Sequence, residues 1–174
     1  MGLSGKHLGT VVDLLRSKRV LVTGNTGFMG SWLSAWLISS GARVTGYSLN
    51  PPTDPSMFDV IGLKSRMTCE LGDINDLEHL KNAMQHSRAE VVFHLAAQPL
   101  VRRSYLEPIL TFDTNIVGTA KVLRLFGERP RSKPVSVSLA TSVMKTGNGF
   151  TGTERMIQWE ARTPIALARG PRSS

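Results

Sequence analysis

The feature that most constrains this chain lies within residues 19–30, where an apolar run is followed by three regularly spaced glycines. The run, Arg-Val-Leu-Val-Thr, predicts a buried strand of a parallel sheet, and Gly24, Gly27 and Gly30 follow it at three-residue intervals. An amphipathic or buried helix is expected from about Met29. This order of strand, glycine turn and helix N-terminus indicates a pyrophosphate site, because free helix amides face the anion and the glycines let the backbone approach it. The alternative is a tight turn that holds no ligand.

The composition is that of one soluble globular domain. The chain has 174 residues, of which 41% are hydrophobic and 20% are charged. No apolar run is long enough to span a membrane, and the N-terminus lacks a signal-peptide pattern. Cys69 is the only cysteine, so it forms no intramolecular disulfide, and no metal-ligand cluster is present in the sequence. These features predict a cytoplasmic protein with no metal site and no membrane partner.

The net charge of +8 raises the question of nucleic-acid binding. The cations are scattered, apart from a group at the end of one expected helix and in the loop after it, namely Arg124, Arg129, Arg131 and Lys133. Cations at a helix C-terminus are expected from the helix dipole alone. The aromatic residues needed for base stacking are few and lie in apolar patterns. We therefore expect no nucleic-acid partner.

The order of apolar runs and turn residues predicts alternating strands and helices. Strands are expected at about 19–23, 44–47, 67–70, 91–96 and 134–138, and helices at about 29–40, 77–85 and 108–126. The run Asn50–Pro55 is expected to form a surface loop because of its three prolines. This alternation predicts an α/β fold, a Rossmann-type doubly wound parallel sheet, which binds ligands beyond the carboxyl ends of its strands.

The character of the chain changes after Ser138. Residues 139–174 contain five cations and two anions and show no clear strand or helix period. We therefore divide the chain into a flexible lead-in (1–14), a nucleotide-binding domain (15–138) and an aberrant, disordered tail (139–174). The tail does not read as the second half of an α/β domain, so the fold is expected to be truncated.

Four motifs within residues 15–138 are similar to those of one enzyme superfamily. They are Gly24–Leu33, Gly72–Ile74, His94–Arg102 with Ser104 and Tyr105 after it, and Thr114–Thr119. Together they resemble the extended short-chain dehydrogenase/reductase superfamily and, within it, the CDP-glucose 4,6-dehydratases of the NAD-dependent epimerase/dehydratase family. The run Gln-Pro-Leu-Val-Arg at 98–102 is much more specific to these dehydratases than the glycine turn is.

The resemblance implies a lyase of deoxysugar biosynthesis whose partner is a sugar nucleotide. It implies that CDP-glucose becomes CDP-4-keto-6-deoxyglucose by oxidation, water elimination and reduction on bound NAD, and that an intact member can form a homodimer. The cofactor-binding residues that it implies are Gly24, Thr26, Gly27, Phe28, Met29, Gly30, Asp73, Ile74, Leu95, Ala96, Ala97 and Asn115. Its implied substrate residues are Gln98, Arg102 and Tyr105.

Several of these residues also have a purely structural interpretation. Asp73 can cap a turn, and Ala96 and Ala97 can be small core residues. Asn115 can be a polar residue on a helix surface, although the matching Asn of the superfamily helps to hold the catalytic lysine. Both interpretations stay open for each position.

The remaining polar candidates are interpreted in the same way. His94 lies in an apolar strand and is expected to be a hydrogen-bonded core histidine rather than a catalyst. Arg102 and Tyr105 can face either a sugar nucleotide or solvent. No catalytic residue is therefore assigned among them.

The sequence departs from the family pattern at the turn and after the second strand. The family usually has His where Asn25 stands and Lys where Met29 stands, so one cation near the phosphates is lost. A dinucleotide fold often has an acidic residue about 20 residues beyond the glycines for the ribose hydroxyls. Here that region offers the neutral Ser48 and Asn50, so the choice of NAD over NADP rests on the resemblance.

The catalytic motifs of the family are absent from this chain. Its reaction needs a tyrosine base with a lysine four residues later, and a Ser-Asp-Lys motif after the fifth strand. The chain has two tyrosines; Pro51 follows Tyr47 at that spacing, and Ile109 follows Tyr105. We therefore expect no dehydratase turnover from the chain as printed.

A shift of reading frame would explain both absences. In the alternative frame, residues 139–147 are compatible with Ser-Asp-Lys-Cys-Tyr-Glu-Asn-Arg, and residues 159–171 with Gly-Gly-Thr-Asp-Pro-Tyr-Ser-Thr-Arg-Lys-Gly. These are the two missing motifs, in order and in one frame. We therefore hypothesise that the chain is out of frame from about residue 139, through a pseudogene, a mutation or a sequencing error.

Two other functions stay open. One is a non-catalytic nucleotide-binding module, which would bind NAD without turnover. The other is a related NAD(P)-dependent sugar-nucleotide epimerase or reductase, which activity of the repaired gene on a panel of sugar nucleotides would distinguish.

Overall fold

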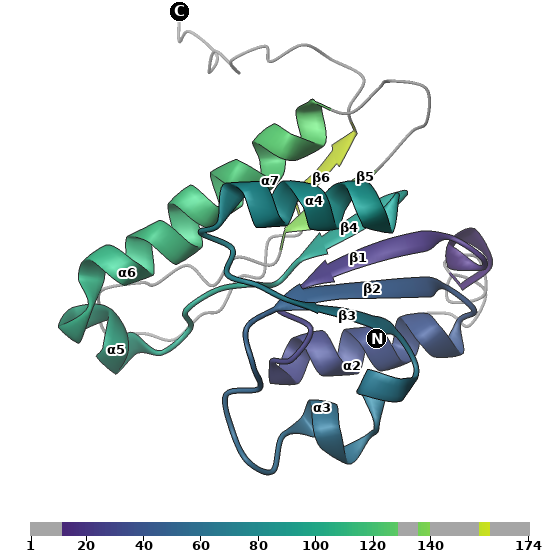
Figure 1. The fold of residues 1–174 in the computed structure, drawn as a ribbon, viewed down its shortest axis with the longest axis horizontal. Coiled ribbons are helices and arrows are strands. Elements are labelled where there is room, and N and C mark those ends of the chain that lie inside the picture. Colours follow the sequence, from purple (N-terminus) through teal and green to yellow (C-terminus); the bar gives the residue numbers. More distant parts are fainter. Residues whose placement is uncertain (1–11, 129–135, 140–156, 161–174) are drawn as a thin grey trace, which may run out of the picture.

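The computed structural model describes residues 12–128, 136–139 and 157–160. Its centre is a six-stranded sheet in the order β3-β2-β1-β4-β5-β6 (Figure 1). The strands are β1 (Arg19–Thr23), β2 (Arg43–Ser48), β3 (Thr68–Leu71), β4 (Val91–His94), β5 (Ser136–Leu139) and β6 (Ile157–Glu160). Neighbouring strands are parallel, except that β5 and β6 are antiparallel.

Helices cover both faces of the sheet. They are α2 (Phe28–Ser39), α3 (Met57–Val60), α4 (Leu77–Ser87), α5 (Val101–Leu106), α6 (Pro108–Phe112) and α7 (Gly118–Gly127), with a 3-10 turn at Leu63–Ser65 and a π turn at Asp113–Val117. Helices α2 and α3 lie on one side of the sheet, and α4 and α7 lie on the other (Figure 1). None of the helices in the described ranges is long and apolar enough to cross a membrane.

Alternate residues of the central strands fill two apolar layers, because side chains of a strand point to opposite faces. One layer packs β1 and β2 against α2 through Val20, Val22, Leu37 and Val44. The other packs the opposite face against α4 and α7 through Leu21, Tyr47, Leu80, Met84, Val92, Val122 and Phe126. The strands are therefore held from both sides where they lead to the candidate site.

Local sequence signals explain where several helices begin. The side chain of Asp76 accepts a hydrogen bond from the His79 amide and caps α4. Pro108 stands in the first turn of α6, where its missing N–H costs nothing. By contrast, Gly27 precedes α2 and offers no side-chain cap. The first amides of α2 are thus left for another acceptor.

The predicted Rossmann-type, doubly wound parallel sheet is confirmed, and the predicted helices and strands are present. The strand expected at 91–96 ends at His94. The helix expected at 108–126 contains the π turn, and the short helices α3 and α5 were not predicted.

The structure also differs from expectation at both ends of the chain. Residues 12–14, within the expected flexible lead-in, are helical. Strand β6 lies inside 139–174, where the sequence predicts no strand, and it pairs with β5 from Ser136 opposite Glu160 to Leu139 opposite Ile157. The rest of the lead-in and of the tail lies outside the described residues.

Candidate functional site

The glycine turn between β1 and α2 has a backbone that only glycine can follow at two positions. Gly24 has a φ of +73°, and a Cβ there would lie 2.7 Å from the amide nitrogen of Ala96. At Gly30 a Cβ would overlap the carbonyl oxygen of Gly24. Both glycines thus allow backbone segments to approach closely, and the turn lies directly beside the end of β4.

Hydrogen bonds fix this turn to the sheet. The amide of Gly24 donates to the Tyr47 carbonyl (2.9 Å), and the Thr26 hydroxyl donates to the Leu49 carbonyl (2.9 Å). The Ser31 hydroxyl lies 2.8 Å from the Gly27 carbonyl oxygen. The turn is therefore a rigid cradle whose helix end, without a side-chain cap and without an acidic residue in its first turn, suits an anion.

Two side chains at the start of α2 point away from the core. Phe28 and Met29 are both exposed, so at these positions the contribution to an anion site comes from backbone amides. Asn25 is buried instead. Its two side-chain polar atoms have no hydrogen-bond partner in the described part of the chain, and a Cβ at Gly46 would overlap this amide.

The loop after β3 is held by a buried tyrosine. The Tyr47 hydroxyl donates to the Asp73 carbonyl oxygen at 2.8 Å, and a Cβ at Gly72 would lie 2.5 Å from the Tyr47 ring. Burial, followed by the charges of Asp76, Asp73 and Glu70, raises the pKa of Tyr47 to about 12.

The two predicted cofactor residues of this loop have different surroundings. The Asp73 carboxylate is exposed and accepts the Asn75 amide at 2.8 Å, so it caps a turn while staying accessible. Ile74 is buried in the apolar layer under α4 and α7. A Cβ at Gly118 would lie 2.9 Å from the Ile74 side chain, so this loop also touches the start of α7.

The segment after β4 completes the edge of the site. Its first two amides bond Thr23: Leu95 N donates to the carbonyl oxygen (3.1 Å) and Ala96 N to the hydroxyl (3.3 Å). Leu95, Ala96 and Ala97 are half-buried. Because β1 and β4 are neighbours with Thr23 opposite His94, this segment lies beside the glycine turn.

The amide side chains of Asn115 and Gln98 form hydrogen bonds with the rest of this loop. Asn115, in the π turn, accepts the Gln98 amide (2.7 Å) and donates to the Gln98 carbonyl (3.1 Å). Gln98 in turn accepts the Leu100 amide (2.6 Å) and donates to the Leu100 carbonyl (3.2 Å) and the Thr111 hydroxyl (3.0 Å). Gln98 is therefore buried and committed to the loop rather than turned to a substrate.

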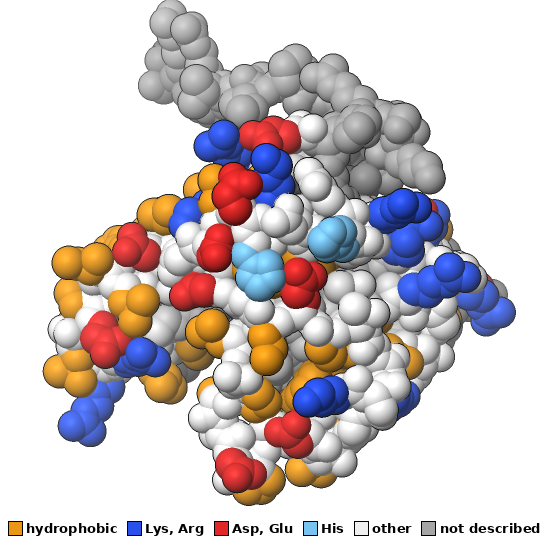
Figure 2. All heavy atoms as spheres, viewed as in Figure 1, with side chains coloured by type: hydrophobic (Ala, Val, Ile, Leu, Met, Phe, Trp, Pro, Cys, Tyr) orange, Lys and Arg blue, Asp and Glu red, His pale blue; other side chains and the backbone are white. Residues whose placement is uncertain are grey.

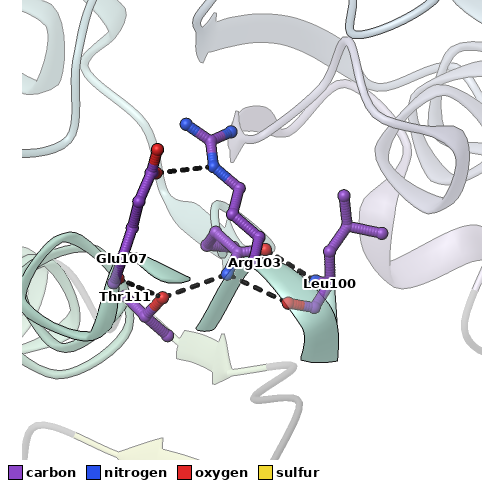
Figure 3. A network of polar contacts seen from close by, with 5 residues as sticks. Leu100, Arg103, Glu107 and Thr111 are labelled. Atoms are coloured by element: carbon purple, nitrogen blue, oxygen red, sulfur yellow. Dashed lines mark hydrogen bonds and ion pairs between the residues drawn. The ribbon is translucent and has the colours of Figure 1, made fainter. Parts of the chain in front are cut away.

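The hydrogen-bonded network continues along α5 and α6 (Figure 3). The Thr111 hydroxyl donates to the Glu107 carbonyl oxygen at 2.9 Å, and the Glu107 carboxylate accepts from Arg103 Nε at 2.8 Å. Arg102 and Tyr105, the other predicted substrate residues, are exposed on α5 and have no polar partner in the described ranges. Both side chains are therefore accessible to solvent.

His94 is a core histidine, as its apolar strand predicts. Its side chain lies 2.6 Å from Thr23 Oγ1 through Nδ1 and 3.1 Å from Thr119 Oγ1 through Nε2. Burial lowers the pKa of His94 to about 4, so it is neutral at physiological pH.

Sequence reasoning missed the residues that support this site. Thr23, Tyr47, Thr111 and Thr119 hold its loops by hydrogen bonds, yet each occurs in an ordinary strand or helix pattern. Gly118 offered the one usable signal, since a glycine inside a helical pattern indicates close packing.

Comparison with known proteins places this geometry in a family. The sequence model described as GDP-mannose 4,6 dehydratase matches residues 21–144. The chain is 53% identical to CDP-glucose 4,6-dehydratase of Salmonella typhimurium over 108 residues, which are 62% of this chain and 30% of that protein. It is 35% identical to a GDP-mannose 4,6-dehydratase of Sordaria araneosa, over 69% of this chain and 22% of that protein.

Solved structures agree with the fold. A UDP-glucose-4-epimerase from Stenotrophomonas maltophila, with bound NAD and formylated UDP-arabinopyranose, matches with a TM-score of 0.56 and 30% identity, over 63% of this chain and 33% of that one. The epimerase Mth375 from Methanothermobacter thermautotrophicus matches with a TM-score of 0.59 and 27% identity, over 72% and 36% of the two chains. The chain spans less than a third of the two dehydratases named above. By its match over residues 21–144, the chain belongs to the GDP-mannose 4,6 dehydratase family.

Proposed function

We propose that this chain carries the NAD-binding part of a sugar-nucleotide 4,6-dehydratase, with CDP-glucose as the sugar nucleotide. The observation that carries the proposal is the glycine turn, a rigid helix N-terminus without a side-chain cap that lies against the segment after β4. The identity of 53% to a CDP-glucose 4,6-dehydratase supports the choice of sugar nucleotide. The epimerase structure that holds NAD supports the choice of cofactor.

The residues around the turn fit a dinucleotide. The amides of Phe28, Met29 and Gly30 would receive the pyrophosphate, since nothing in the described chain caps them by a side chain. Asp73 and the loop before Ile74 would contact the adenine. The half-buried Leu95, Ala96 and Ala97 would lie under the remainder of the nucleotide, where their small or apolar side chains leave it room.

The absence of positive charge after β2 favours NAD over NADP. No Lys or Arg occurs between residues 44 and 63, so no cation from this stretch could pair with a 2′-phosphate. Bound NAD would supply the hydride acceptor for the oxidation and the donor for the reduction. The role of Asn115 would be indirect, because its amide holds the backbone of Gln98.

The 174-residue chain is proposed to bind NAD without catalysing the dehydration of CDP-glucose. Tyr47 cannot act as the tyrosine base, because its hydroxyl is buried, donates to the Asp73 carbonyl and has a raised pKa. Tyr105 is exposed and has no lysine four residues later. Its neighbour Arg102 remains a candidate for the sugar-nucleotide phosphates, since its guanidinium has no partner in the described chain.

The change in the character of the sequence after Ser138 supports the same proposal. We infer that the reading frame changes near residue 139, so that the family's catalytic motifs are hidden in the tail. Sequencing the gene tests this inference. A single insertion or deletion near codon 138 that restores both motifs would support it, and a gene with no such solution would contradict it.

Nucleotide binding is the first test. Isothermal titration of the 174-residue chain with NAD is expected to show saturable binding. The variant Gly30→Ala should lose it, because the added Cβ would overlap a backbone carbonyl that cannot move aside. Gly127→Ala is the matched control, since nothing lies within 4 Å of a Cβ there. Equal binding by both variants would contradict the proposed site.

Turnover is the second test. The printed chain should convert no CDP-glucose, whereas the frame-corrected protein should release a 4-keto-6-deoxy sugar nucleotide detectable by mass spectrometry. Conversion by the printed chain would contradict the proposal. Preference of the corrected protein for epimerisation of UDP-glucose would favour the epimerase alternative, to which the likeness in sequence is lower, 30% in the solved structure.

Self-association and location complete the proposal. Hydrophobic side chains gather over α5 and α6 (Figure 2), where Leu106, Ile109 and Phe112 are exposed. An exposed apolar surface of this kind suits a partner, and we propose a homodimer for the intact protein. The free, half-buried Cys69 suits the reducing cytoplasm.

A further inference from the structure

The loop on which the proposed dinucleotide would lie is held at both ends by one closed set of hydrogen bonds. At one end of the loop the Ala96 amide bonds Thr23. Thr23 bonds His94, His94 bonds Thr119, and Thr119 bonds Asn115. At the other end of the loop, the Asn115 side chain forms two hydrogen bonds with the backbone of Gln98. Only Ala97 lies between the two ends.

The order of donors in this set is determined by the hydroxyl groups. Thr119 Oγ1 donates its single hydrogen to the Asn115 carbonyl oxygen at 2.7 Å. It can therefore only accept from His94 Nε2, at 3.1 Å, so Nε2 carries the imidazole hydrogen.

The other half of the set has the same direction. With Nε2 protonated, Nδ1 of the neutral ring is an acceptor and receives the hydroxyl hydrogen of Thr23 at 2.6 Å. The Thr23 hydroxyl in turn accepts the Ala96 amide at 3.3 Å. One tautomer thus satisfies every member, and each hydrogen bond polarises the next.

We propose that His94, in its Nε2–H form, is a positioning residue of the nucleotide site. Through its hydrogen bonds it fixes the position of the backbone of residues 96–98 relative to the glycine turn. It does so without touching the ligand, since its side chain is 2% exposed. The proposal rests on the proposed NAD-binding function and adds to it the residues that shape the loop.

The π turn supports this role. The amide of Gly118 bonds the Asp113 carbonyl, five residues back, so the helix is widened at Asp113–Val117. Insertions of this kind in an α-helix are frequent at functional sites. Here the widened turn carries Asn115, which uses its backbone carbonyl toward Thr119 and its side chain toward Gln98. Asn115 therefore connects Thr119, the hydrogen-bond partner of His94, to the backbone of Gln98.

The test uses two variants of Thr119 in the full chain. Thr119→Val removes the hydroxyl while it keeps the shape, and Thr119→Ser keeps the hydroxyl. We expect the Kd for NAD to rise about five- to tenfold in Thr119→Val, the factor that one hydrogen bond is worth, and to stay near the wild-type value in Thr119→Ser. Both are measured by titration on samples whose folding is checked by thermal melting.

Nitrogen-15 NMR of the wild-type imidazole provides a readout that a merely structural threonine would not change. We expect the Nε2–H tautomer for His94 in the wild type and in Thr119→Ser, and a mixture of tautomers in Thr119→Val. An Nδ1–H form in the wild type, or unchanged NAD affinity in folded Thr119→Val, would overturn the positioning role alone. Failure of the wild-type chain to bind NAD would overturn the proposed function, and the positioning role with it.

Discussion

Asn25 is the residue whose surroundings match its chemistry least well. Its side chain is 1% exposed, and neither of its amide atoms has a hydrogen-bond partner in the described chain. A buried amide without partners costs roughly 1–3 kcal/mol. The side chain also occupies the space beside Gly46, so this glycine on β2 and the asparagine in the turn depend on each other.

This dependence predicts the outcome of a double-mutant cycle. Gly46→Ala should destabilise the chain by about 2 kcal/mol, because its Cβ overlaps the Asn25 amide. Asn25→Ala alone should change the free energy of unfolding by less than about 1 kcal/mol, since it removes an amide without partners. The double variant should recover at least about 1 kcal/mol of the loss at Gly46. Urea unfolding measures all three, and strictly additive effects would show that the two side chains do not meet.

The buried His94 predicts a pH dependence of stability. Its pKa is about 4 in the folded chain against an ordinary 6.5. As the pH falls from 6.5 to 4, the unfolded chain gains a proton that folded His94 does not take up. Stability should therefore decrease over this range, by up to about 3 kcal/mol from this residue.

The variant His94→Asn provides the control for that prediction. Its amide can replace the acceptor toward Thr23 but does not titrate. Unfolding free energies between pH 4 and 7 should show a smaller slope for the variant than for the wild type. Equal slopes would mean that the acid loss comes from carboxylates such as Glu90, whose pKa is lowered by its bonds to Arg19 and Lys18.

Individual elements differ in how well their sequence predicts them. Strands β1, β2 and β4 and helices α2 and α4 have strong apolar periods or end signals, and their positions follow from the sequence. The π turn does not, and it carries Asn115, whose bond to Gln98 joins segments that are distant in the sequence and has no local signal. The same holds for β6, whose pairing with β5 is the interaction that defines it. Of the site, the glycine turn was predictable, whereas the supporting threonines were not.

Helix α2 illustrates a different limit of sequence patterns. It contains no charged residue, which is typical of a helix buried all round. In the structure one side faces the sheet through Leu37, which is 0% exposed, while Trp32 is 54% exposed. The apolar sequence therefore does not mean that every side of α2 is covered in the described chain.

This asymmetry predicts effects of very different size on stability for the same substitution at two positions of α2. Trp32→Lys should change the unfolding free energy by less than about 1 kcal/mol and reduce self-association, because it breaks an exposed apolar surface. Leu37→Lys should cost more than about 3 kcal/mol, since it buries a charge without a partner. Urea unfolding and light scattering compare them. Equal destabilisation would show that Trp32 is packed against another part of the chain.

At the scale of the whole molecule, charge and site act on the same ligand. The net charge of +8 attracts any anion, whereas the proposed site would offer a fixed set of backbone amides in the glycine turn to one pyrophosphate. Weak attraction by scattered cations is screened by salt. In the proposed site, by contrast, the loop after β3 and the segment after β4 lie on either side of the turn, so binding there would depend on the whole nucleotide.

This difference predicts how ligands shift the melting temperature. NAD at about 100 times its Kd should stabilise the folded chain by about 2.7 kcal/mol and raise the Tm by on the order of 10 °C. Inorganic pyrophosphate at the same concentration should raise it less, because it lacks the groups that reach the loops beside the turn. Added salt of about 0.3 M should reduce the effect of pyrophosphate more than that of NAD. Equal shifts by the two ligands, lost together in salt, would mean that net charge rather than the glycine turn binds the nucleotide.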